Sequence, residues 1–188
     1  MERWVLLRKG ADFEAIGKKY QISPRLACLI RNRDVIGEEA VDRYLNGTIS
    51  DLYDGMLMKD MDKAIDILKE KILEDKKIRV IGDYDIDGVN ATYILLEGLE
   101  RLGADVDSDI PDRISDGYGL NRHLVERAYE AGVDTLITCD NGIAAADEIA
   151  YGKEMGMTVI VTDHHEVPFD EHDGEKRYRI PPADAVMD

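Results

Sequence analysis

Short runs rich in β-branched residues alternate with longer segments of helical periodicity from residue 78 onwards. Expected strands cover Ile78–Ile81, Val106–Ile110, Thr135–Cys139 and Thr158–Thr162, and expected helices cover Val89–Leu102, Leu120–Ala131 and Ala144–Met155. Strands joined by helices of this length require right-handed crossovers, so the strands pair in parallel. The alternation therefore predicts an α/β fold in which a mostly parallel, Rossmann-like sheet is flanked by helices.

The first part of the chain lacks this alternation. Residues 1–55 are expected to form a short helical N-terminal extension, and residues 56–188 the α/β domain. Ser23 followed by Pro24 is typical of a helix start, because Ser caps the helix and Pro fits its first position. Another helix is expected over Glu38–Leu45.

Three further segments complete the expected organisation. A long amphipathic helix is expected from Asp60 to Asp75, after a loop over Asp51–Lys59. The charged, Pro-containing segment Phe169–Pro182 is expected to be a loop or linker. Beyond it, Ala183–Met187 is expected to begin one more strand.

The net charge of −16 at pH 7 is unevenly distributed along the chain. Residues 1–50 contain nine Lys and Arg against seven Asp and Glu, whereas the remaining residues contain 15 against 33. A strongly acidic domain repels polyphosphate unless cations or basic surfaces elsewhere offset its charge. Charge alone thus argues against an autonomous nucleic-acid binder, and a solvated acidic surface explains most of the carboxylates.

The lengths of the apolar stretches and the number of cysteines indicate where in the cell the protein is expected to be. No apolar stretch approaches the roughly 20 residues that a bilayer requires, so no membrane partner is expected. The apolar run at the N-terminus, residues 4–7, is too short for a secretory signal. Cys28 and Cys139 are expected to be free thiols. These features predict a cytoplasmic protein.

Three carboxylates stand within five residues in Gly82-Asp83-Tyr84-Asp85-Ile86-Asp87-Gly88, directly after an expected strand. Alternate residues on an extended or turning backbone point the same way, so Asp85 and Asp87 are expected to converge on one metal ion. Hard carboxylate oxygens select Mg²⁺ or Mn²⁺. The alternative is an Asp-rich turn with a helix cap. An EF-hand is excluded because the Glu required at its twelfth position is missing.

Two further strand ends present candidate ligands. Asp140 follows the strand that ends at Cys139, and it is expected to be either a helix cap or a metal ligand. Asp163, His164 and His165 follow the next strand. Adjacent histidines point in different directions, so one is expected to be a ligand and the other to face substrate, with Asp163 orienting an imidazole. Parallel strands bring such ends to one crevice, which favours a metal site over chance.

These residues carry a resemblance to a known family. Asp163-His164-His165 and residues 82–88 resemble the motifs of the DHH phosphoesterase superfamily, and more narrowly those of the RecJ single-stranded-DNA-specific exonucleases. The segments Met58–Ala64, Ile110–Arg113, Asp116–Leu120 and Thr138–Ile143 also resemble that family. The resemblance spans most of the chain in matching order and spacing.

The resemblance implies a two-metal site that holds Mn²⁺ or Mg²⁺. The implied ligands are Asp85, Asp87, Asp140 and His164, with Asp83 as a further candidate. His165 would contact the scissile phosphate as a catalytic side chain, together with Asp163.

The resemblance also implies the substrate and its contacts. The substrate would be single-stranded DNA, degraded from the 5′ end in repair and recombination, with a single-stranded-DNA-binding protein or a helicase as possible further partners. The implied substrate-binding residues are Arg113, Tyr118, Gly119 and Asn141. From the residues alone, Arg113 could equally pair with Asp112 or Asp116, and Tyr118 could stack on substrate or anchor its loop.

Two departures from the family pattern matter. Many members carry a His four residues before the first ligand Asp, where this chain has Ile81. The family also continues with a further metal-binding Asp, a second domain and an oligonucleotide-binding domain, so this chain is expected to be incomplete at its C-terminal end and to lack one ligand. The alternatives are a small-substrate DHH phosphodiesterase, acting on oligoribonucleotides or cyclic dinucleotides, and, for this chain alone, a non-catalytic binding module.

Overall fold

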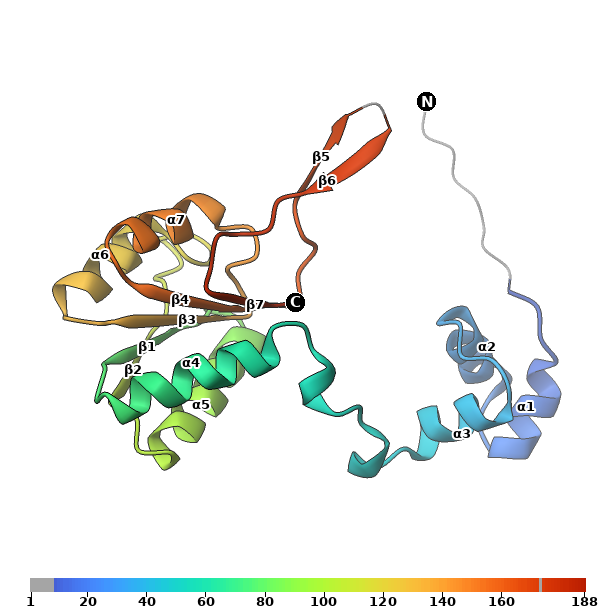
Figure 1. Ribbon diagram of the computed structural model, residues 1–188. Coiled ribbons are helices and arrows are strands. Elements are labelled where there is room, and N and C mark those ends of the chain that lie inside the picture. Colours follow the sequence, from blue (N-terminus) through green and yellow to red (C-terminus); the bar gives the residue numbers. More distant parts are fainter. Residues whose placement is uncertain (1–8, 173) are drawn as a thin grey trace. The chain divides into compact units, whose positions relative to one another are not determined.

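Figure 1 shows the computed structural model of the chain, which describes residues 9–172 and 174–188. The chain divides into two compact units between Asp54 and Gly55. The first unit is helical. The second is an α/β unit that contains all the Asp- and His-rich segments singled out in the sequence.

The described part of the first unit, from residue 9 on, contains three short helices and a 3₁₀ turn: α1 (Phe13–Tyr20), α2 (Pro24–Asn32), α3 (Glu38–Asn46) and η1 (Ile49–Asp51). The Ser23 hydroxyl accepts a hydrogen bond from the Leu26 amide, and Pro24 takes the first helical position, so the predicted start of α2 is confirmed. The buried hydrophobic side chains described in this unit are Ala27, Ile30 and Val41.

Five strands form the main sheet of the second unit, in the order β2-β1-β3-β4-β7. They are β1 (Ile78–Ile81), β2 (Val106–Asp109), β3 (Thr135–Cys139), β4 (Thr158–Thr162) and β7 (Ala185–Met187). Every pair of neighbours is parallel. The predicted fold class, a mostly parallel sheet flanked by helices, is confirmed.

Helices cover both faces of this sheet (Figure 1). On one face lie α6 (Arg122–Glu130) and α7 (Ala146–Glu154), and on the other lie α4 (Met61–Leu73) and α5 (Ile86–Arg101). Because alternate strand residues point to opposite faces, Ile81 joins the core under α6 and α7, whereas Val80 joins the core under α4 and α5. Within the described residues, no helix has the length and apolar character needed to cross a membrane.

The strand order reverses at β1. From β1 the chain moves outwards to β2, and the following strand, β3, lies on the opposite side of β1. The loops that leave the carboxyl ends of β1 and β3 therefore lead to helices on opposite faces, which opens a crevice between them. These two loops are Gly82–Asp85 and Asp140–Ala145.

Several predictions about element boundaries are wrong. α6 and α7 each begin two residues later than predicted, at Arg122 and Ala146. α5 begins at Ile86 rather than at Val89, because Asp85 caps the helix. The predicted loop Asp51–Lys59 contains the end of η1 and a second 3₁₀ turn, η2 (Gly55–Leu57). The predicted loop Phe169–Pro182 contains an antiparallel hairpin of β5 (Phe169–His172) and β6 (Glu175–Tyr178). The expected last strand is confirmed as β7, which pairs with β4.

Two glycines allow the loop after β1 to pack closely against α5. A Cβ atom built at Gly88 would lie 2.5 Å from the backbone oxygen of Asp83, and one built at Gly82 would overlap the hydroxyl of Thr92. The neighbours of Gly88 are backbone atoms, which cannot rotate away. This close approach therefore holds Asp83 and Asp85 in place at the end of β1.

Gly88→Ala should destabilise the protein by about 2 kcal/mol or more, because the added methyl group overpacks the loop backbone. Gly98→Ala is the matched control on the same helix: a Cβ there meets no atom within 4 Å, so it should stabilise by about 0.5–1 kcal/mol through helix propensity. Urea unfolding followed by circular dichroism measures both. Equal effects of the two substitutions would contradict the packing argument.

Candidate metal centre

The loop after β1 presents two carboxylates in different surroundings. Asp85 accepts hydrogen bonds from the Gly88 and Asp87 amides, both at 2.9 Å, and these bonds, led by the one from Gly88, hold the pKa of Asp85 below its ordinary value. Asp83 is fully buried; the Gly119 amide donates to its Oδ1 at 3.4 Å, and its Oδ2 has no partner among the residues that the structure describes. This loop thus offers one ionised carboxylate and one unused buried oxygen.

Asp140 stands directly after β3 in a left-handed backbone conformation, with φ of 59°, which Asp tolerates better than most residues. The residue is 7% exposed. Its Oδ1 lies 2.7 Å from the Nε2 of His164, and its Oδ2 has no hydrogen-bond partner within residues 9–172 and 174–188. α7 begins only at Ala146, with Ala145 at the capping position, so Asp140 is not the cap of that helix. Its carboxylate is therefore available as a ligand.

Asp163 connects the loops that follow β3 and β4. Its Oδ2 accepts from the Ile143 amide at 2.9 Å, and its Oδ1 lies 2.7 Å from the Nδ1 of His165 and accepts from the His164 amide at 2.8 Å. Burial raises the pKa of Asp163, but these hydrogen bonds outweigh burial and lower it overall. Conversely, the hydrogen bond from Asp163 raises the pKa of His165. Asp163 therefore orients the His165 ring and favours its protonated form.

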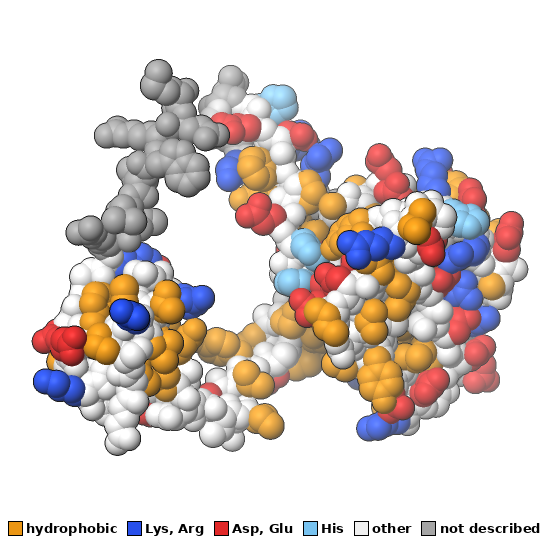
Figure 2. Space-filling view, turned by 180° about the vertical axis from the view of Figure 1, so that it is seen from behind, with side chains coloured by type: hydrophobic (Ala, Val, Ile, Leu, Met, Phe, Trp, Pro, Cys, Tyr) orange, Lys and Arg blue, Asp and Glu red, His pale blue; other side chains and the backbone are white. Residues whose placement is uncertain are grey.

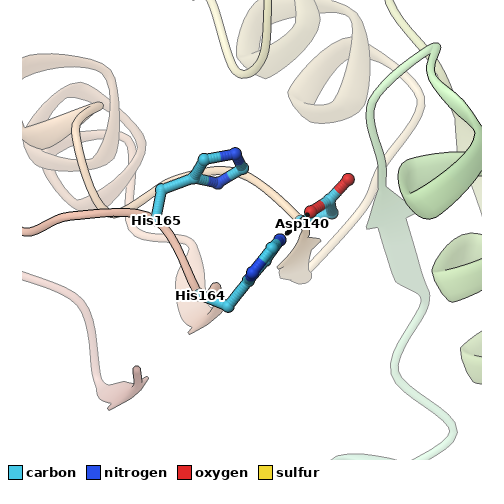
Figure 3. Close-up of side chains that lie close together, drawn as sticks. All are labelled: Asp140, His164 and His165. Carbon is cyan, nitrogen blue, oxygen red and sulfur yellow. Dashed lines mark hydrogen bonds and ion pairs between the residues drawn. The ribbon is translucent and has the colours of Figure 1, made fainter. Parts of the chain in front are cut away.

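Asp140, His164 and His165 form a cluster at the carboxyl edge of the sheet (Figure 3). One potential ligand atom from each residue lies within 4.8 Å of the other two. The two imidazole rings lie near each other, with centroids 4.7 Å apart, but they face different groups: His164 faces Asp140, whereas His165 lies between Asp163 and Tyr118. Figure 2 shows histidine side chains beside acidic ones on the surface of this unit. The ends of β3 and β4 thus meet as the parallel sheet predicts.

The electrostatics of this cluster fit a divalent cation. Burial first, and also the charge of Asp85, raises the pKa of Asp140, although the hydrogen bond with His164 opposes them. A cation would offset the repulsion between Asp85 and Asp140 and would give the unpartnered Oδ2 atoms of Asp83 and Asp140 a partner. Carboxylate oxygens with an imidazole nitrogen are a donor set for Mg²⁺ or Mn²⁺, and the nitrogen favours Mn²⁺. Asp85, Asp140 and His164 could hold such an ion, with Asp83 as a further donor.

Aromatic rings border the cluster. The Tyr118 hydroxyl lies 3.2 Å from His165 Nε2 and 3.5 Å from the Asp140 backbone oxygen. Burial, followed by the charges of Asp83 and Asp140, raises the pKa of Tyr118 to about 12, so the hydroxyl keeps its proton. The ring of Tyr84 meets that of Tyr118 edge-on at 6.1 Å, and the Arg113 guanidinium lies 5.2 Å from the Tyr84 ring centre. Tyr84 was not among the predicted site residues, although its place between Asp83 and Asp85 could have marked it.

Two predicted site residues have other surroundings than expected. Asp87 lies in the first turn of α5 rather than on an extended backbone, and its convergence with Asp85 on one metal ion stays a prediction. Within the described residues, the cluster of Asp140, His164 and His165 includes neither Asp87 nor the other predicted ligands of this loop, Asp83 and Asp85. Asn141 is 2% exposed, and its Nδ2 donates to the backbone oxygens at the ends of β1 and β3, which braces the two strands.

Arg113 forms no ion pair with Asp112 or Asp116 within the part of the chain that the structure describes. Asp112 instead accepts hydrogen bonds from the Ile114 and Ser115 amides, and Asp116 accepts from the Asp112 amide. Both carboxylates shape the turn of their own loop. Arg113 is therefore left to stack on Tyr84 at the border of the cluster.

The protein is thus a doubly wound α/β protein. Carboxylates and imidazoles meet at the carboxyl edge of its sheet and form a candidate metal site. A family model described as the DHH family, N-terminal domain, matches residues 77–187. The matched range contains both motif-bearing loops and every strand of the main sheet. The chain belongs to this family.

Curated relatives with similar sequences are single-stranded-DNA-specific exonucleases named RecJ. The Bacillus subtilis protein is 39% identical over 165 residues, which cover 87% of this chain and 21% of that relative. The Escherichia coli protein is 29% identical over 188 residues, which cover 100% of this chain and 30% of that relative. The chain therefore spans less than a third of the length of either relative.

Two solved structures share the fold. A crystal structure described as exonuclease RecJ bound to manganese has a TM-score of 0.59 and 39% identity, covering 69% of this chain and 31% of that one. The structure of RecJ from Thermus thermophilus in complex with Mn²⁺ also has a TM-score of 0.59, with 28% identity, and covers 92% of this chain and 22% of that one. Both similarities support the architecture described above.

The Asp163–His165 pair should make the stability of the metal-free protein depend on pH. Because the pKa of His165 is raised in the folded protein, the protonated ring stabilises the fold. This stabilisation is complete below about pH 6.5 and is lost as pH rises through the raised pKa. The lowered pKa of Asp163 means that its own contribution is present above about pH 3.9 and is lost as pH falls through the lowered value.

Asp163→Asn should therefore cost about 2–3 kcal/mol at pH 6 and less at pH 9, because at pH 9 the neutral imidazole still donates to Asp163 but the hydrogen bond no longer joins two opposite charges. Urea unfolding in EDTA at both pH values measures the difference. Asp170→Asn on the exposed β5 strand should change stability by less than about 0.5 kcal/mol at either pH. An equal loss of stability at both pH values would show that the Asp163–His165 hydrogen bond does not cause the pH dependence.

Asp140→Asn should weaken Mn²⁺ binding at least about tenfold without lowering the stability of the metal-free protein. The substitution removes an anionic ligand, but it also removes a buried charge that Asp85 repels. Calorimetric titration with Mn²⁺ and unfolding in EDTA measure the two effects. Asp147→Asn, an exposed carboxylate in the first turn of α7, is the control and should leave Mn²⁺ affinity unchanged. Unchanged affinity of Asp140→Asn would remove Asp140 from the ligand set.

Proposed function

We propose that this chain is the metal-binding catalytic part of a RecJ-like exonuclease that hydrolyses phosphodiester bonds of single-stranded DNA from the 5′ end, in DNA repair and recombination. The observation that carries this proposal is the cluster of Asp140, His164 and His165, with Asp85 close to Asp140, at the switch point of the sheet. Membership of the DHH family and the names of the RecJ relatives support it.

Mn²⁺ or Mg²⁺ is the cofactor in this proposal. Asp85, Asp140 and His164 hold it, Asp83 is a further donor, and Asp87 remains a candidate ligand from the family resemblance. Such ions lower the pKa of a bound water and neutralise charge on the phosphate. The manganese named with two RecJ structures supports the choice of metal. The acidic surface then attracts phosphate only where cations are bound.

His165 is the side chain proposed to act on the phosphate. Asp163 holds its Nδ1, which leaves Nε2 on the side of Tyr118 and the crevice. The hydrogen bond to Asp163 raises the pKa of His165 and so favours the protonated ring, whose Nε2–H would donate to a phosphate oxygen in place of the Tyr118 hydroxyl. Such a donor, placed before the reaction begins, stabilises charge that develops in the transition state.

The DNA strand is proposed to pass along the border of the cluster. Arg113, which has its guanidinium on the Tyr84 ring, would meet the phosphate backbone, and Tyr118 and Gly119 would meet the adjacent nucleotide. A single-stranded-DNA-binding protein or a helicase is a proposed partner of the complete polypeptide, and the cytoplasm its proposed location. In this proposal Asn141 contributes to substrate binding indirectly: its hydrogen bonds to the ends of β1 and β3 hold the loop after β3 in position.

In the complete polypeptide, His164→Ala should lower Mn²⁺-dependent digestion of single-stranded DNA at least about a hundredfold, because an ion ligand is lost. His123→Ala is the matched control, an exposed histidine on α6 away from the cluster. Gel assays would compare 5′-labelled and 3′-labelled single-stranded DNA with duplex DNA, short RNA and cyclic dinucleotides. Preference for either small substrate, or full activity of His164→Ala, would contradict the proposal.

A further inference from the structure

A small pocket adjoins the metal centre on the side of α7. It encloses about 170 Å³, and its walls include the small residues Gly119, Gly142, Ala144 and Ala145. The pocket is next to the cluster because Gly142 lies two residues after Asp140 in the same loop. Tyr118 forms another wall, and Glu148, in the first turn of α7, supplies a carboxylate.

The Tyr118 ring is exposed and yet fixed in position. It is 54% exposed, but its hydroxyl is held by His165 Nε2 at 3.2 Å and by the Asp140 backbone oxygen at 3.5 Å. The edge-on contact with Tyr84 restrains the ring from another side. An aromatic face that is already ordered loses little conformational entropy when a planar group stacks on it.

The charges around the pocket exclude a phosphate as its occupant. Neither Lys nor Arg is among the residues that line it, and Glu148 would repel an anion. Residues without long side chains leave room for a flat ring against Tyr118. The chemistry of the walls therefore fits a neutral, planar group that carries hydrogen-bond donors.

We propose that this pocket binds the nucleobase of a nucleotide next to the scissile phosphate, stacked on Tyr118. This inference rests on the proposed function, since it places a base beside the cluster on which the phosphate would lie. The pocket holds the base on one side, while the phosphate is held by the ions and by His165. The nucleotide is thereby fixed at two points during hydrolysis.

Glu148 makes the pocket selective among bases. A carboxylate accepts hydrogen bonds from the exocyclic amino groups of adenine, cytosine and guanine. Thymine has no amino group, and its one donor, N3–H, lies between two carbonyl oxygens that a carboxylate repels. The half-buried position of Glu148 strengthens this discrimination relative to a solvated carboxylate. Deoxycytidine and deoxyadenosine should therefore bind more tightly than thymidine, by roughly fivefold or more.

Amide NMR of the chain in EDTA tests the pocket with deoxyadenosine, deoxycytidine and thymidine as probes. These nucleosides carry no phosphate and require no ion, so the result is independent of whether the chain binds metal or hydrolyses DNA. Binding should shift the amides of Gly119, Gly142, Ala144 and Ala145. Tyr118→Ala should weaken binding of all three nucleosides roughly tenfold, the loss expected for one base–aromatic stack. Tyr118→Phe keeps the aromatic ring, so this variant should retain most of the binding affinity.

Glu148→Gln should reduce the preference for deoxycytidine over thymidine to less than about twofold, because a neutral amide accepts a weaker hydrogen bond. Asp147→Asn, the neighbouring carboxylate that does not line this pocket, should leave the preference intact. Shifts centred elsewhere, equal binding to wild type and Tyr118→Ala, or a preference that survives Glu148→Gln would each overturn the assignment. Loss of nuclease activity with intact nucleoside binding would instead contradict only the proposed function.

Discussion

The candidate metal centre depends on the hydrogen bonds that the Asp163 carboxylate accepts. From a side chain that is 1% exposed, it joins the Ile143 amide in the loop after β3 to His164 and His165 in the loop after β4. Two strand ends that are far apart in sequence are thereby held together. The Asp140 amide, which donates to the Thr162 backbone oxygen at 3.1 Å, and the contact between Asp140 and His164 at 2.7 Å add to this link. Together these bonds hold the ligand positions at Asp140 and His164.

The same edge of the sheet concentrates groups that oppose folding when no cation is bound. Asp83 and Asp140 each bury an oxygen without a partner, and Asp85 raises the pKa of Asp140. Burial of this kind costs stability in the free protein. A protein selected for stability alone would replace these groups with apolar side chains. Their presence at the switch point is what connects the fold to the proposed chemistry.

The fold could be predicted from the sequence because its signals are local. Alternating β-branched runs and helical periods placed all five parallel strands, and Ser23-Pro24 placed the start of α2. The failures came where a side chain competes with the local pattern. Asp85 caps α5 and starts it early, which moves Asp87 onto the helix, and the β5–β6 hairpin forms from a charged segment that has no alternating apolar signal.

The sequence by itself determined which chemistry was possible, since three strand ends carry Asp and His side chains, whose oxygen and nitrogen atoms are ligands for divalent cations. It also determined the parallel sheet that brings those ends together. Only the tertiary structure decided which groups meet: the adjacent imidazoles of His164 and His165, the stacking of Arg113 on Tyr84, and the fixed ring of Tyr118 beside a pocket. These contacts are set by loop backbone conformation and burial, neither of which has a periodic signature in the sequence.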